Sequence, residues 1–134
     1  MRRGDFLLPE KIKYGHSAAT DQYFYRAVSY YREKFSDKKC LRILLLGNDP
    51  EWNRSIVKEN FSDVILINTG SAEVDLCILS SCNHSIISSG SFGYWGAFMA
   101  GGHATYQKEY CVNGSEVCKN VEVADYFLPH WVPL

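Results

Sequence analysis

The sequence has no apolar run long enough to cross a bilayer, and no apolar stretch follows its first residues as in a signal peptide. It also lacks an excess of charge, since 14 basic and 15 acidic residues give a net charge of −1. Such a balance does not favour general binding to nucleic acids or membrane surfaces. We therefore expect no transmembrane segment in this chain, no nucleic-acid partner and, from these residues, no route into the secretory pathway.

Patterns that bind metals are also scarce. Cys77, Cys82 and His84 lie close together in the sequence, but a separation of five residues on a helix directs the two cysteines to different sides. The chain has no Asp-x-Asp pair of the kind that holds a metal–nucleotide complex. We therefore expect no metal site.

The cysteines that are present give a mixed signal about the compartment. Cys111 and Cys118 bracket "CVNGSEVC", whose Asn-Gly step favours a tight reversal, so this pair can close a small disulfide loop. Cys77 and Cys82 stand among apolar residues and are expected to be buried thiols. Asn-x-Ser glycosylation sequons occur at Asn53, Asn60, Asn83 and Asn113. Sequons and a disulfide favour a lumenal location, against the missing signal.

The order of apolar segments predicts an α/β fold. The length of 134 residues suits one domain with one core, and no segment repeats. Helices are predicted over 20–35, 48–60, 72–82 and 90–102, and strands over 42–47, 64–67, 84–89 and 104–107. The continuous apolar runs at 42–47 and 64–67 predict strands that are buried on both faces. In the first helix, Thr20 is a candidate N-cap, and the apolar face comprises Phe24, Ala27, Val28, Tyr31 and Phe35. Asp49 is a candidate N-cap of the second helix with Pro50 at its first position, and Gly101 and Gly102 are expected to end the fourth helix. Strands that alternate with helices imply one parallel sheet with right-handed crossovers.

Ligands of such sheets bind beyond the carboxyl ends of the strands. Two loops with suitable chemistry follow predicted strands, namely "GNDP" at 47–50 and "SSGSFG" at 88–93. If a strand precedes Arg2, "RRGD" at 2–5 is a third loop on the same edge. The sheet as written starts without that strand, so we expect a fold that is incomplete at its N-terminus.

The "SSGSFG" loop has two readings. Unpaired backbone N–H groups at a helix start attract phosphate, which Gly90 and Gly93 would let approach while Ser91 adds a hydroxyl donor. Alternatively the string is a serine N-cap with turn glycines. It has neither the G-x-G-x-x-G spacing of dinucleotide folds nor the lysine of a P-loop, and it is not a G-x-S-x-G nucleophile elbow.

Charged residues near these loops are also open to two readings. Asp75 can stabilise a helix start, or its two carboxylate oxygens can accept hydrogen bonds from a guanine. Arg2 and Arg3 can bind a diphosphate through their guanidinium forks, or they can form a solvated basic terminus. Arg3, Gly4 and Asp5 also spell an Arg-Gly-Asp adhesion tripeptide.

Four motifs carry a resemblance to a known family. In order, "RRGDF", "GNDPEWNR", "DLCILSSCNHSIISSGSFGYWGAFMAGG" and "FLPHWVPL" are similar to the alpha-1,2-fucosyltransferases, glycosyltransferase family 11, with the nematode branch nearest in its "NDPEW" form. The resemblance covers the chain from Arg2 to the end. It implies a GT-B-like enzyme of the Golgi membrane or lumen, whose C-terminal Rossmann-like half binds GDP-fucose. It also implies inverting transfer of L-fucose to a galactose hydroxyl of a glycan, without an obligatory metal.

The resemblance assigns site residues by position. Arg2 and Arg3 would contact the GDP diphosphate, with Arg3 stabilising the leaving group as the catalytic residue, and Asp5 would brace the turn. Asp75 would hold guanine. The remaining donor-binding residues would be Asn48, Asp49, Ser91, Phe92 and Gly93.

The chain departs from the family pattern at two places. A histidine that the family carries two residues before the arginine pair has no counterpart, and Asn53 stands where a cysteine often follows the tryptophan. We therefore expect residues 1–134 to form a single, incomplete donor-binding domain. The alternative is a catalytically inactive nucleotide-sugar-binding remnant of that family.

Overall fold

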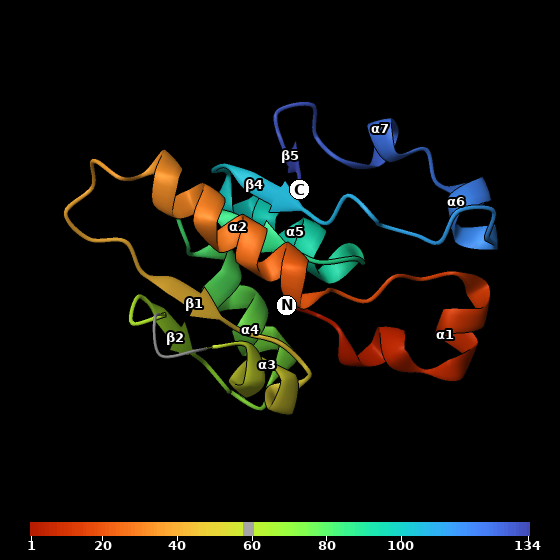
Figure 1. Cartoon of the computed structure of the whole chain (residues 1–134), viewed down its shortest axis with the longest axis horizontal. Helices are drawn as coiled ribbons and strands as arrows, with labels where there is room; N and C mark the ends of the chain where they lie inside the picture. Colours follow the sequence, from red (N-terminus) through yellow and green to blue (C-terminus); the bar gives the residue numbers. More distant parts are fainter. Residues whose placement is uncertain (58–60) are drawn as a thin grey trace.

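The computed structural model shows an α/β fold with parallel strands and flanking helices (Figure 1). The structure describes residues 1–57 and 61–134. The helices are α1 (Pro9–Tyr14), α2 (Asp21–Lys34), α3 (Pro50–Ile56), α4 (Ala72–Ser80), α5 (Ser91–Ala100), α6 (Glu116–Asn120) and α7 (Val123–Tyr126), with a 3-10 turn η1 (Gly4–Leu7). The strands are β1 (Ile43–Leu45), β2 (Val64–Leu66), β3 (Ser85–Ile87), β4 (Ala104–Tyr106) and β5 (Val132–Pro133). All strand pairs in these sheets are parallel.

Helix α2 confirms the predicted first helix. The side chain of Thr20 accepts a hydrogen bond from the backbone N of Tyr23, which satisfies a donor that the helix itself leaves unpaired. Four of the five residues predicted for the apolar face are buried, and Phe35 is half-buried. Tyr23, which the pattern did not select, is fully buried as well.

Two tyrosines tie α2 to β3 and β4. The hydroxyl of Tyr23 lies 2.6 Å from the carbonyl oxygen of Ile87 and 3.0 Å from that of Thr105, and it donates its proton to one of them at a time. The hydroxyl of Tyr31 bridges the carbonyl oxygens at the starts of the same two strands, at 2.9 Å each. Burial raises the pKa of both hydroxyls, so they remain neutral donors at any physiological pH.

The predicted single sheet is divided in two. Strands β1 and β2 form one sheet, and β3, β4 and β5 form the other. Strands β1 and β3 do not pair, because a cavity of about 480 Å³ lies between them. The short β5 adds to β4 at an edge where no strand was predicted, through hydrogen bonds between Leu134 N and Tyr106 O and between Lys108 N and Leu134 O.

Each sheet has its own core. The first core joins α2, β1 and α3 and contains Ala19, Phe24, Val28, Leu45, Trp52, Ile56, Phe61 and Val64. The second joins β3, β4, α5 and the C-terminal segment and contains Ile87, Ala97, Ala104, Tyr106, Tyr110, Val117, Phe127 and Trp131. Helices α4 and α5 pack closely at Gly96, where the absence of a side chain leaves room for Leu79.

Two burial predictions are wrong. Strand β2 is not buried on both faces, since Ile65 and Leu66 are 42% and 41% exposed. Strand β2 lies at the outer edge of its sheet, so only Val64 reaches the core. Cys77 is exposed rather than buried, because it stands on the outer side of α4, and Cys82 is half-buried.

The predicted disulfide is confirmed. Cys111 and Cys118 are bonded, with their Cα atoms 5.5 Å apart. The closed loop is fastened to the N-terminal segment, since Val112 N donates to Gly15 O at 3.0 Å. Gly15 has a φ of +105°, and a side chain there would collide with Ser115. The disulfide therefore holds the residues that lead into α2.

The sequons differ in accessibility. Asn53 is buried at 5% exposure, so it is not accessible in the folded chain. Asn83 and Asn113 are exposed, and Asn60 lies outside the described residues. In the described part of the chain, no helix combines the length and the apolar character that crossing a membrane requires.

Candidate functional site at the carboxyl edge of the strands

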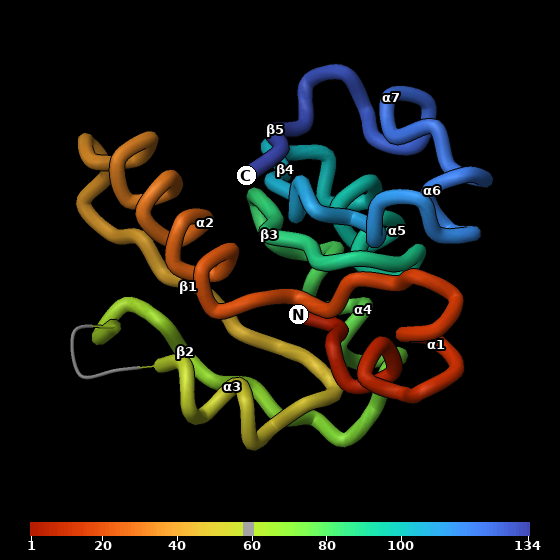
Figure 2. Tube along the Cα trace, turned by 45° about the vertical axis from the view of Figure 1, so that its right-hand side comes forward, coloured from red at the N-terminus to blue at the C-terminus, as the bar shows by residue number. Residues whose placement is uncertain are grey.

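Three loops meet at the carboxyl edge of β1 and β3. The side-chain oxygen Oδ1 of Asn48, after β1, accepts hydrogen bonds from the backbone N of Arg3 at 2.9 Å and of Gly4 at 3.0 Å. Ser88, after β3, donates from Oγ to the carbonyl oxygen of Arg2 at 2.7 Å. The "RRGD" turn at residues 2–5, called the arginine turn below, is thus bound to both neighbouring loops. Figure 2 shows the N-terminal segment running between β3 and the unit of β1, β2 and α3.

Arg3 is held in a fixed position within this turn. Its Nε donates to the carbonyl oxygen of Ala19 at 3.0 Å, and its Nη1 donates to Oδ2 of Asp49 at 2.8 Å. The guanidinium also stacks over the Trp52 ring, 5.0 Å from the ring centroid. Among the described residues, its Nη2 has no hydrogen-bond partner, so that nitrogen is available to a ligand.

Asp49 links the arginine turn to α3. Its Oδ1 accepts from the backbone N of Trp52 at 3.1 Å, which confirms the predicted N-cap, and Pro50 occupies the first helical position. The indole nitrogen of Trp52 donates to Asp21 at 2.7 Å. The sequence pattern gave Asp49 a capping role, but it gave no sign that the same carboxylate binds Arg3.

Arg2 lies on the other side of the turn. Its guanidinium forms an ion pair with Asp5 at 2.5 Å within the same turn. It also lies 5.0 Å from the ring centroid of Phe92, in the first turn of α5. Asp5 is 53% exposed at its side chain, so solvent weakens this pair and an anion can compete for Arg2.

The start of α5 carries no side-chain cap. Gly90 is the N-cap residue and Ser91 the first helical residue, so the reading of this loop as a serine N-cap is wrong. The first backbone N–H groups of α5 therefore remain available to an anion. Gly90 has a φ of +96°, and a side chain there would lie 2.9 Å from the Phe6 ring.

Gly93 has a packing reason as well as a suggested ligand role. It is buried, and a side chain at this position would lie 3.1 Å from Cβ of Ile87 on β3. The glycine therefore allows α5 to pack closely against the strand. Ser91 is exposed and points to no partner in the described structure.

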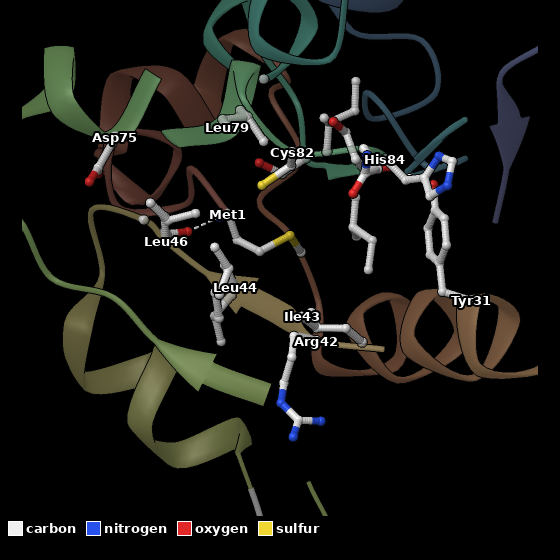
Figure 3. A pocket seen from close by; sticks show the side chains of 18 of the residues that line it. Met1, Tyr31, Arg42, Ile43, Leu44, Leu46, Asp75, Leu79, Cys82 and His84 are labelled. Atoms are coloured by element: carbon white, nitrogen blue, oxygen red, sulfur yellow. Dashed lines mark hydrogen bonds between the residues drawn. The ribbon is translucent and has the colours of Figure 1, made fainter. Parts of the chain in front are cut away.

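Asp75 lies farther along the cavity, in α4. Its Oδ1 accepts a hydrogen bond from the hydroxyl of Thr69 at 2.6 Å, while Ser71 rather than Asp75 caps the helix. Asp75 lines the same cavity as Arg2 and Phe92, and Figure 3 shows it at this cavity together with Met1. Each carboxylate oxygen accepts more than one hydrogen bond, so the bond from Thr69 leaves room for a base.

The edge as a whole is suited to an anion. Two guanidinium groups and the free end of α5 provide positive charge on one side, and the carboxylates of Asp5 and Asp49 orient them. The structure brings together the arginine turn, Asn48, Asp49 and Phe92, and Asp75 lines the same cavity as Arg2 and Phe92. No group of three or more metal-ligating side chains occurs in residues 1–57 and 61–134.

Sequence reasoning missed the supporting residues. Ser88, Trp52 and Thr69 each hold a predicted site residue, yet only their position beside a predicted loop offered any signal. The Arg-Gly-Asp tripeptide is not displayed as a free loop, because Arg3 is bonded within the fold.

Comparison with known proteins identifies relatives. The model of "Glycosyl transferase family 11" matches residues 1–134. Galactoside alpha-(1,2)-fucosyltransferase 1 of Saimiri boliviensis boliviensis is 30% identical over 135 residues, covering 98% of this chain and 36% of the relative. The protein of the same name from Ateles belzebuth is 32% identical over 139 residues, with the same coverage. The chain thus spans about a third of the length of these relatives. No solved structure matches it.

Proposed function

The chain belongs to glycosyl transferase family 11, and from this premise we propose that it forms the donor-binding part of a GDP-fucose-dependent fucosyltransferase. We assign residues 1–134 to one Rossmann-like domain, the C-terminal half of a GT-B-like enzyme. The observation that carries the proposal is the meeting of the arginine turn with the uncapped start of α5.

The diphosphate of the donor would lie between the arginine turn and α5. Arg2 offers its guanidinium beside Phe92, and the N–H groups at the start of α5 lie on the same side. Arg3 offers Nη2, while its other nitrogens are occupied by Ala19 and Asp49. A guanidinium fixed in this way needs no reorganisation when negative charge develops on a leaving group.

The guanine base would be held by Asp75. The two oxygens of a carboxylate can pair with the two adjacent N–H groups on one edge of guanine. Uracil lacks that pair of N–H groups, so this contact would select GDP-fucose over sugars linked to uridine diphosphate. The hydroxyl of Thr69 would keep the carboxylate in orientation through its 2.6 Å hydrogen bond.

The reaction would be an inverting transfer. The oxygen of a galactose hydroxyl of a glycan forms a bond to the anomeric carbon of fucose, and the proton of that hydroxyl passes to a general base or to solvent. The bond from that carbon to the β-phosphate oxygen breaks, and GDP leaves with the electron pair. Arg3, and Arg2 beside it, would stabilise that charge, so no metal is required for this role. The chain covers 36% of its relatives, so we place most acceptor contacts outside these residues.

The second candidate is a nucleotide-sugar-binding remnant that does not catalyse transfer. The pairing of both arginines with carboxylates favours this candidate, because each carboxylate neutralises positive charge that would otherwise stabilise the leaving group. Both candidates predict binding of GDP, and only the first predicts turnover.

Two measurements on the same protein separate the candidates. Isothermal titration with GDP, GDP-fucose and UDP measures donor binding, and transfer of labelled fucose to a galactose-terminated glycan measures turnover. Binding of GDP with transfer supports the enzyme, and binding without transfer supports the remnant. Absence of GDP binding by a folded chain rejects both.

A further inference from the structure

The cavity of about 480 Å³ that Asp75 lines has the form of a slot between two strands. It separates β1 from β3 and extends along both of them, from Arg42 to Gly47 on one side and from Ser85 to Ser88 on the other. Helices α2 and α4 close it with Phe24, Tyr31 and Leu79. Figure 3 shows Met1 inside the slot, with Leu44 of β1 on one side and Cys82 on the other.

The two strands that border the slot run in the same direction. The loops that follow them both reach the arginine turn, through Asn48 after β1 and Ser88 after β3. Their carboxyl ends therefore lie at one edge. A segment between them can run parallel to both, as every strand pair in the two sheets already does.

The peptide groups on both walls have the polarity that a strand needs. Ile43 on β1 and Ser85 on β3 donate their backbone N–H away from the slot, at 2.9 Å each, to the residues that precede β2 and β4. Since successive residues of a strand direct their peptide groups to opposite sides, Leu44 and Ile86 direct theirs into the slot. Buried peptide groups require partners, which an inserted strand would supply.

Met1 already forms the first bond of such a ladder. Its nitrogen donates to the carbonyl oxygen of Leu46, and Gly47 makes room, because a side chain there would collide with the Met1 backbone. Burial of this α-amino group lowers its pKa to about 5, against the opposing effect of Asp75. A peptide bond on the same nitrogen would keep an N–H donor for Leu46 and remove the charge that burial disfavours.

We propose that the slot holds one further parallel strand, an extended and largely apolar segment joined by a peptide bond to the nitrogen of Met1. The two sheets then become one, in the order β2-β1-strand-β3-β4-β5. Because helices as well as strands wall the slot, apolar and β-branched residues suit successive positions, over roughly five residues. The added strand lies where the strand order reverses, which is where open α/β sheets bind ligands, and it would hold Arg2 and Arg3 there.

Extended forms of the full chain test this proposal. The first carries Thr-Val-Ile-Val-Val before Met1. The matched control has proline at the second and fourth added positions, which removes ladder donors while leaving the segment apolar. Hydrogen exchange and urea unfolding, measured without nucleotide, report on the slot independently of donor binding. We expect the first form to slow exchange at the amides of Leu44 and Ile86 by about tenfold or more relative to the control, and to raise the urea midpoint.

A separate peptide and a wall variant sharpen the outcome. The same five-residue peptide added in trans should not protect these amides, because its end would stand against the buried Met1 amine. Ile86→Lys should remove the gain of the extended form, since it places a charge beside the new strand. Equal behaviour of the two extended forms, whether folded or unfolded, or protection by the free peptide equal to that of the joined segment, overturns the proposal.

Discussion

Asp49 binds two partners with one carboxylate. Its Oδ2 accepts from Nη1 of Arg3 at 2.8 Å, while its Oδ1 caps α3 at Trp52 N. The position of the arginine turn is therefore coupled to the start of a helix that packs in the first core. A single residue links the candidate site to the fold.

Replacing Asp49 should separate its two roles. Asp49→Ala removes the cap and the ion pair, so we expect a loss of about 1–2 kcal/mol in the free energy of unfolding. Asp49→Asn keeps a capping oxygen and should lose only about 0.5 kcal/mol, while it frees Arg3. Urea denaturation measures both, with Asp37→Asn at an exposed ion pair as the control. Equal losses for the two variants would remove the capping role.

Arg2 should matter to donor binding more than to stability. Arg2→Ala removes a charged contact to the diphosphate, and we expect the Kd for GDP to rise by about tenfold or more. The exposed Arg26, whose partner Glu109 is 3.7 Å away, provides the control Arg26→Ala. Titration calorimetry on both variants is decisive, because an unchanged Kd for Arg2→Ala would place the phosphate elsewhere.

Asp75 should select the base. Asp75→Ala is expected to weaken GDP by about tenfold while it leaves the weaker binding of UDP nearly unchanged. Asp75→Asn should lie between, because the amide retains one acceptor oxygen. Glu73→Ala serves as the control in the same titrations, because Glu73 is exposed and lies two residues before Asp75 in the first turn of α4. A parallel loss for both nucleotides would show that Asp75 acts on the fold rather than on guanine.

The disulfide should stabilise the N-terminal segment. Cys111→Ser with Cys118→Ser opens a short loop, and the loop-entropy model gives a loss of about 2–3 kcal/mol. Because this loop contacts Gly15, hydrogen exchange should increase at residues that lead into α2. The thermal midpoint of the double variant, compared with that of Cys40→Ser at an exposed free cysteine, measures the effect. A midpoint that does not fall would contradict it.

Stability should fall as the pH falls from about 8 to about 5. The pKa of the Met1 amine is lowered from 8.0 to about 5 in the folded chain, so the unfolded chain binds more protons in this window. Burial also lowers the pKa of His16 and His84, which adds in the same direction near their ordinary value. The Met1 amine alone should contribute a slope of at most about 1.4 kcal/mol per pH unit.

Acetylation of the Met1 nitrogen isolates its share of that slope. The acetylated chain keeps an N–H donor for Leu46 but has no amine to titrate, so its stability should depend less on pH between 5 and 8. Urea midpoints across this range compare the two forms. An identical pH profile would show that the amine is not buried in solution.

Local signals predicted much of the fold. The cap at Thr20, the Asp49-Pro50 start of α3 and the stop of α5 at Gly101 each depend on residues within one turn, and all three are present in the structure. The Asn-Gly reversal likewise brought Cys111 to Cys118. The exposure of β2 and Cys77 was not predictable in this way, because it depends on which neighbours cover them.

The sequence by itself determined the alternation of helices and strands, the caps and the three loops with ligand chemistry. These features follow from apolar spacing and from backbone groups that local side chains satisfy. Only the tertiary structure decided that Asp49 pairs with Arg3, that α5 starts uncapped, and that β1 and β3 stand apart around Met1. Each of these depends on contacts between residues far apart in the chain, and such contacts produce no regular spacing of residues in the sequence.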